Sequence, residues 1–184
     1  MTDIAPEFPE GLVLFRGDQK IAEGGLEAVG AAAAEALAAA PDRPVLAFDL
    51  ATGRLVDLDY RAPPPAPPEP ARRGRPKLGV VAREVTLLPR HWDWLAQQPG
   101  GASVALRRLV EQARKTHVGI DEHRRRRDGA YRFMSAMAGD APGFEEASRA
   151  LFAGDRARLA ELMAPWAGDI VATINELLGP EGAA

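Results

Sequence analysis

The chain has 184 residues, of which 46% are hydrophobic, so it is long enough to bury a core in one domain or in two small ones. It contains no cysteine, which excludes disulfides and thiolate metal sites, and its formal net charge is -3. The opening residues, MTDIAPEFPE, do not resemble a signal peptide, and no run of about 18 apolar residues predicts a membrane span. We therefore expect a soluble, cytoplasmic protein of bacterial type.

The first predicted element is a β-hairpin. The stretch LVLFRGDQKIAEG, residues 12–24, has two short strand-like runs on either side of Gly17 and Asp18. Both of these residue types tolerate the positive φ that two-residue hairpin turns require. We interpret the Arg-Gly-Asp sequence at this point as part of the turn.

A helix and a second hairpin follow. The alanine-rich segment GLEAVGAAAAEALAAA, residues 25–40, predicts a helix because its larger apolar residues recur at spacings of three and four and a proline follows it. The stretch PVLAFDLATGRLVDLDYR, residues 44–61, predicts a strand, a turn at Thr52-Gly53 and another strand. Residues 1–61 should thus form an N-terminal antiparallel sheet with one helix.

Three aspartates of this second hairpin, Asp49, Asp57 and Asp59, are the candidates for an acid/base or metal site. Paired carboxylates form such a site only when they pack closely enough to share an ion or to shift a pKa. The alternative is that they form the solvated face of a two-sided hairpin. An enzyme with a carboxylate site on this hairpin is therefore one of the hypotheses that the sequence leaves open.

The segment 62–78 is predicted to be a linker. Residues 62–70 are almost all proline or alanine, which is typical of an extended spacer between folded parts. The basic stretch RRGRPKLG follows, and its Arg-Gly-Arg-Pro-Lys core resembles an AT-hook, in which two arginines lie along a narrow A/T-rich minor groove. The DNA-contacting candidates here are Arg72, Arg73, Gly74, Arg75, Pro76 and Lys77. The alternative is a solvated basic hinge.

Charge is strongly segregated along the chain. Residues 72–132 contain 15 Lys and Arg against 6 Asp and Glu, whereas residues 1–71 contain 5 against 12 and residues 133–184 contain 3 against 8. A basic segment within an acidic chain indicates a polyanionic partner, and DNA is the partner that we expect. The alternative is that the basic middle docks on the acidic ends.

The segment 79–128 has a distinctive order of elements. It predicts a strand at 83–88, a short helix at 89–98, a stop at Pro99-Gly100-Gly101 and a second helix from about Ser103 to Lys115, with Ser103 as its N-cap. This arrangement resembles the ribbon-helix-helix family of DNA-binding proteins at its Leu88-Pro89 junction and its Gly-x-Ser sequence at 101–103.

The ribbon-helix-helix resemblance implies an obligate homodimer. Residues 83–88 of two chains would pair as an antiparallel ribbon in the DNA major groove, and the start of the second helix would hold a phosphate. The contact residues would be Arg83, Thr86, Ser103, Arg107 and Arg108. The strand departs from the family's pattern, because one alternation exposes Val85 and Leu87 to the DNA and the other exposes Glu84. Which face of the strand is buried is left open.

Other residues of the middle segment have simpler interpretations. Trp92, Trp94 and Leu95 predict core packing of a short helix. The consecutive arginines 124–127 would wrap around a helix and form a solvated or electrostatic surface. The three histidines lack the spacing of a metal site, so we expect neither metal nor cofactor.

The C-terminal region, residues 129–184, is predicted to be helical. The sequence Ala-Gly-Asp occurs at 138–140, 153–155 and 167–169. In each copy the glycine is expected to end a helix in the left-handed conformation and the aspartate to N-cap the next helix.

The whole chain also resembles a bacterial family known only as a domain of unknown function. The resemblance rests on GRPKLGVVAREVTLLPRHWDWLAQQPGGASVALRRLVEQAR, FDLATGRLVDLD and FEEASRALFAGD. It implies a shared architecture and no chemistry. We expect an α+β protein without catalytic residues, a transcriptional regulator or nucleoid-associated factor; the other hypothesis is a protein-interaction module with an antitoxin-like partner.

Overall fold

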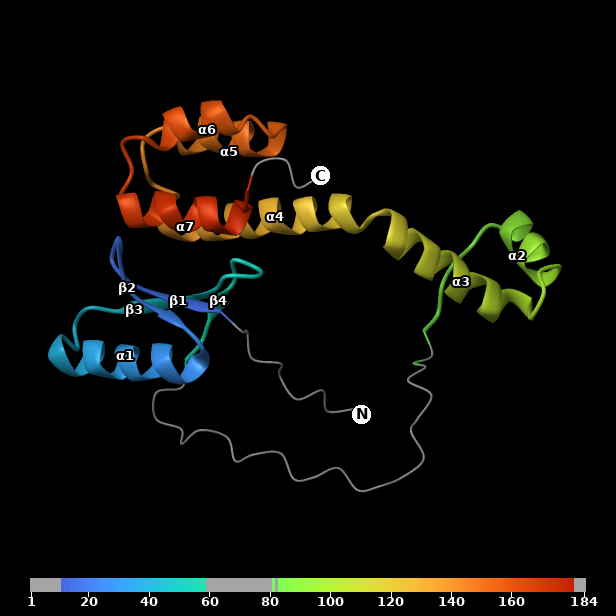
Figure 1. Ribbon diagram of the computed structural model, residues 1–184, viewed down its shortest axis with the longest axis horizontal. Coiled ribbons are helices and arrows are strands. Elements are labelled where there is room, and N and C mark those ends of the chain that lie inside the picture. The colour runs from blue at the N-terminus through green and yellow to red at the C-terminus, as the bar shows by residue number, and fades with distance from the viewer. Residues whose placement is uncertain (1–10, 59–80, 82, 181–184) are drawn as a thin grey trace, which may run out of the picture. The chain divides into compact units, whose positions relative to one another are not determined.

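The computed structural model describes residues 11–58, 81 and 83–180 (Figure 1). They fall into two compact units. The first, here called the sheet unit, contains residues 11–58 and 119–180, and the second, the helix-pair unit, contains residues 81 and 83–118. The described residues form four strands and seven helices, so the predicted α+β class is confirmed.

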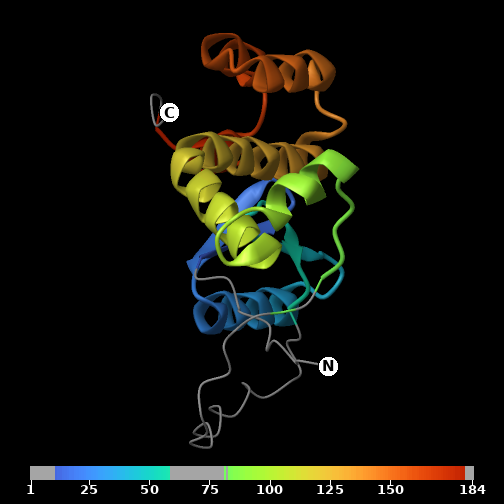
Figure 2. The same cartoon turned by 90° about the vertical axis from the view of Figure 1, so that its right-hand side faces the viewer.

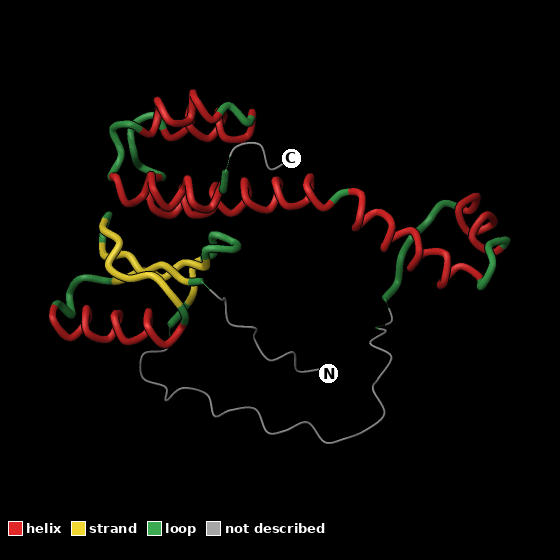
Figure 3. The backbone as a smooth tube through the Cα atoms, in the orientation of Figure 1, coloured by secondary structure: helices red, strands yellow, loops and turns green. Residues whose placement is uncertain are grey.

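The sheet unit is built on an antiparallel sheet with the strand order β2-β1-β3-β4. Its strands and first helix are β1 (Leu12–Arg16), β2 (Gln19–Gly24), α1 (Leu26–Ala39), β3 (Val45–Asp49) and β4 (Leu55–Val56). The predicted order of two strands, a helix and two strands is therefore confirmed, and Figure 3 shows the strands as one yellow sheet. At the first turn Gly17 has a φ of 59°, whereas no described residue other than glycine has positive φ.

Alternation along β1 gives the sheet two buried faces. Leu12 and Leu14 pack with Val29 of α1, while Val13 and Phe15 pack with the C-terminal helices. The side chains of successive strand residues point to opposite faces, so one strand serves both cores. Figures 1 and 2 show α1 below the sheet, α4 and α7 above it, and α5 and α6 above those.

The upper face is covered by α4 (Val118–Ala138) and α7 (Gly168–Leu178), and α5 (Phe144–Ala153) and α6 (Arg156–Met163) pack beyond them. At its centre the buried rings of Phe48 and Phe133 have centroids 4.9 Å apart in an edge-to-face arrangement, and Phe15 lies 5.4 Å from Phe133. The sequence predicts residues 1–61 and 129–184 as separate regions, but these aromatic contacts join their described parts into one unit.

The predicted role of the Ala-Gly-Asp sequences is confirmed in one copy. Gly154 ends α5 with a φ of 74°, and the Asp155 carboxylate accepts a hydrogen bond from the Arg158 amide at 2.9 Å at the start of α6. In the other two copies the prediction is wrong. Gly143 is the N-cap of α5 in place of Asp140, and Asp169 lies inside the first turn of α7.

The helix-pair unit consists of α2 (Pro89–Ala96) and α3 (Gly101–Thr116). Pro89 opens α2 as predicted, because its missing amide hydrogen is not needed there. Ser103 is not an N-cap, contrary to the prediction: α3 begins after Gly100, whose φ is 81°. Residues 83–88 form neither a helix nor a strand paired within the described part of the chain. The predicted ribbon pairing requires a second chain and stays a prediction.

Candidate functional site

The predicted DNA-contacting residues fall into two groups. Residues 72–77, the AT-hook-like stretch, lie outside the described residues. Arg83 and Thr86 are exposed in the extended segment before α2, and Ser103, Arg107 and Arg108 are exposed on α3. The described candidates thus all belong to the helix-pair unit.

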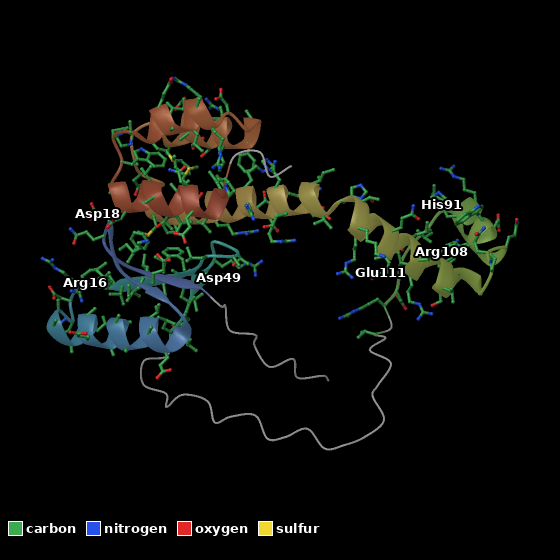
Figure 4. All side chains as sticks on the ribbon, viewed as in Figure 1. Arg16, Asp18, Asp49, His91, Arg108 and Glu111 are labelled. Atoms are coloured by element: carbon green, nitrogen blue, oxygen red, sulfur yellow. The ribbon has the colours of Figure 1, made fainter. Side chains whose placement is uncertain are left out.

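The basic residues of α3 lie on its polar face. Arg107 follows Ser103 by one turn, and its Nε atom donates a hydrogen bond to the Ser103 carbonyl at 3.1 Å. Arg108 and Lys115 are seven residues apart, so they lie above one another on the same side of the helix. Figure 4 labels Arg108 and Glu111 on α3 and His91 on α2.

Few of these charges are neutralised by acidic partners. Arg114 forms an ion pair with Glu111 at 2.9 Å, but both side chains are largely exposed, so the pair contributes at most about 1 kcal/mol. Among the described residues, no acidic side chain pairs with Arg107, Arg108 or Lys115. Arg114 and Lys115 were absent from the predicted contacts, and the only sequence signal for them was the basic balance of the segment.

The helix-pair unit leaves much of its apolar surface uncovered. Leu95 of α2 and Ala105 of α3 are its buried hydrophobic side chains. Between 40% and 54% of each of seven larger side chains is exposed: Val85, Leu88, Trp92, Trp94, Val104, Leu109 and Val110. The expectation that Trp92 and Trp94 pack in a core is therefore wrong for the single chain, because α2 and α3 are too short to cover both rings.

The arginines 124–127 belong to the sheet unit and form ion pairs there. Each pairs with an acidic residue of α4: Arg124 with Asp121, Arg125 and Arg126 with Glu122, and Arg127 with Asp128. The hydrogen bond from Arg126 to Glu122, with the nearby charges of Arg125 and Arg126, lowers the pKa of that carboxyl below its usual value. The Arg127 guanidinium also lies 5.1 Å from the centre of the Phe152 ring. This run therefore supplies less free positive charge than its sequence indicates.

The aspartates of the second hairpin have different surroundings. Both carboxylate oxygens of Asp49 hold the turn, one accepting from the Ala51 amide at 2.8 Å and the other from the Thr52 hydroxyl at 2.6 Å. Asp57 is exposed, and Asp59 lies outside the described residues. Within the residues that the structure describes, no three His, Asp or Glu side chains form a group that would hold a metal ion.

None of the described helices is both long enough and apolar enough to cross a membrane.

Comparison with known proteins identifies one family. No curated protein and no solved structure matches the chain, so the ribbon-helix-helix resemblance has no structural match behind it. A family model described as an uncharacterized protein conserved in bacteria matches residues 11–178, which include both units. The chain therefore belongs to this bacterial family, DUF2239.

Proposed function

We propose that the protein is a non-enzymatic DNA-binding protein, a transcriptional regulator or nucleoid-associated factor, that contacts DNA through the segment 65–118. The observation that carries this proposal is how the charge divides between the two units. Residues 65–118 contain 10 Lys and Arg against 4 Asp and Glu, whereas the rest of the chain contains 13 against 22. A basic unit in an acidic protein attracts a polyanion and directs it to one surface.

The proposal includes a homodimer. The exposed apolar side chains of the helix-pair unit would be covered by the same unit of a second copy, since exposed apolar patches mark interaction sites. Residues 83–88 have no strand partner among the described residues, and antiparallel pairing with their counterpart would supply one. One partner, a second copy, would thus satisfy both requirements.

In this dimer the polar face of α3 would provide phosphate contacts. Arg107 and Arg108 are exposed there, and the backbone amides of Ala102 and Ser103 in the first turn of α3 have no acceptor within the helix. The stretch Arg72–Lys77, which precedes this unit, would add an arginine finger in the minor groove. Phosphate contacts provide affinity, and the finger provides a preference for A/T-rich sequence.

The test is a fluorescence anisotropy titration of the full chain on a labelled duplex of about 20 base pairs at several salt concentrations. We expect the logarithm of the affinity to fall with the logarithm of salt by about one unit for each contacted phosphate. Arg108→Ala should weaken binding and reduce that slope, whereas Arg158→Ala, an exposed arginine of the sheet unit, should change neither. Absence of binding at low salt would contradict the proposal.

The protein-interaction module is the second candidate, and the exposed apolar surface of the helix-pair unit favours it. Here the surface would receive a different protein in place of a second copy. Co-purification of a stable partner protein in the absence of nucleic acid, together with a titration that detects no DNA binding, would select this function over the first.

A further inference from the structure

The sheet unit contains a recess at the end of α4 that the DNA-binding proposal does not use. Its volume is about 400 Å³. It is lined by the last turn of α4 from Ser135, by the loop through Asp140 and Pro142, and by the segment from Pro165 to Ile170. The residues of this wall are thus brought together from two helices and two loops.

The side of the recess at the end of α4 is negative. The other helix end in the lining, the N-terminus of α7 after Ala167, has a positive dipole end that Asp169 in its first turn offsets. The last four carbonyl groups of a helix have no partner within it, and together they give the C-terminal end about half a negative charge. Among the backbone hydrogen bonds that the described residues form outside helices and strands, one reaches these carbonyls. The Ala141 amide donates it to the Ala138 carbonyl at 3.0 Å. Asp140 adds an exposed carboxylate to the lining, and no lining residue is basic.

Apolar side chains form another part of the lining. Trp166 is almost entirely buried, and its indole Nε1 donates a hydrogen bond to the Pro142 carbonyl at 2.9 Å, which holds the ring against the loop that also lines the recess. Met137 and Ile170 are also part of this wall. Apolar side chains beside negative groups favour a cation with an apolar stem, which gains dispersion contacts with them.

We propose that this recess binds an ammonium or guanidinium group carried on an apolar stem. The cation would lie between the end of α4 and the Asp140 carboxylate, and the stem would pack on Trp166 and Met137. The source of the group is either a free organic amine or the basic side chain of a polypeptide, because both carry the same chemistry. This site is independent of the DNA-binding proposal and survives if that proposal fails.

The experiment follows the indole N–H signal of Trp166 by NMR. In the Trp92→Phe, Trp94→Phe double variant, Trp166 is the only tryptophan, and both replaced rings belong to the other unit. The probes are benzylammonium, the neutral benzyl alcohol and the peptide acetyl-Gly-Arg-Gly-amide. We expect a saturable shift with benzylammonium or with the peptide, and the probe that saturates identifies the source as a free amine or a side chain.

Two further variants distinguish a cation site from non-specific contact. Asp140→Asn should weaken the binding of the cationic probe by about fivefold, as expected for the loss of an exposed charge pair. Glu145→Gln, which removes another exposed carboxylate that lies outside the recess, should leave that binding unchanged. Equal shifts with benzyl alcohol, equal effects of the two variants, or no shift with either cationic probe would each overturn the proposal.

Discussion

Gly53 and Gly129 touch through their backbones, although 76 positions separate them in the chain. A Cβ atom on Gly53 would lie 2.6 Å from the carbonyl carbon of Gly129, and Gly53 itself has a φ of +64°. Beside this contact the Arg132 Nη1 atom donates a hydrogen bond to the Thr52 carbonyl at 2.9 Å. The turn between β3 and β4 is thus anchored directly on α4.

Replacing Gly53 should therefore destabilise the sheet unit strongly. Gly53→Ala introduces a side chain both in the left-handed region and against the backbone of α4, which cannot give way as a flexible side chain would. We expect the free energy of unfolding to fall by more than about 2 kcal/mol, measured by urea denaturation.

Gly30→Ala is the matched control for this change. Gly30 lies inside α1, has no positive φ, and a Cβ there would meet nothing within 4 Å. Because alanine is the better helix former, this variant should be more stable by about 0.5–1 kcal/mol. Equal effects of the two substitutions would show that the contact between Gly53 and Gly129 is not tight in solution.

The guanidinium of Arg16 should stabilise the end of α1. This helix has no basic residue in its last turn, and Arg16 of β1 donates from Nη2 to the Ala36 carbonyl in that turn. Arg16→Met keeps much of the apolar stem and removes both the hydrogen bond and the charge near the helix C-terminus. We expect a loss of about 1 kcal/mol in urea denaturation, and Arg54→Met, at an exposed arginine, should cost less than half of that.

The aspartates of two copies of the Ala-Gly-Asp sequence should contribute differently to stability. Asp155 N-caps α6, so Asp155→Ala should lower the stability by about 1 kcal/mol. Asp140 does not cap α5, so Asp140→Ala should change it by less than about 0.5 kcal/mol. Thermal and urea denaturation of both variants would measure the difference, and equal losses would contradict these assignments.

The homodimer should depend on the apolar side of α3. Sedimentation of the full chain at micromolar concentration should give the mass of two chains. Leu109→Glu places a charge on the half-exposed apolar side of α3 and should produce monomers, whereas Glu111→Gln, on the polar face, should leave the dimer intact. A wild-type monomer under these conditions would contradict the proposed association.

The N-terminal sheet could be predicted because its evidence is local. Short continuous apolar runs in 12–16 and 45–49, glycine turns and a proline after the alanine-rich helix each act over a few residues. The start of α3 could not be placed from the same kind of signal. Two positive-φ glycines, Gly100 and Gly101, begin the helix two residues before Ser103, so the serine has no orphan amide to cap.

The association of the C-terminal helices with the sheet could not be predicted from local patterns. It rests on contacts such as that between Phe48 and Phe133, which no helix or strand periodicity links. The same limit applied to the candidate sites. The sequence identified the basic charge of the middle segment, including Arg107 and Arg108 of α3. The pairing of arginines 124–127 with acids of α4 and the recess beside Trp166 required the packed structure.

The most direct measurement compares A/T-rich with G/C-rich duplexes in anisotropy titrations of the wild-type chain, Arg75→Ala and Arg108→Ala. If the segment 65–118 binds DNA as proposed, the wild type binds A/T-rich duplexes more tightly, since a narrow minor groove concentrates negative potential around an inserted arginine. Arg75→Ala should abolish this preference, and Arg108→Ala should weaken binding to both duplexes equally and keep it. No binding at low salt, or an A/T preference that survives Arg75→Ala, would contradict the account.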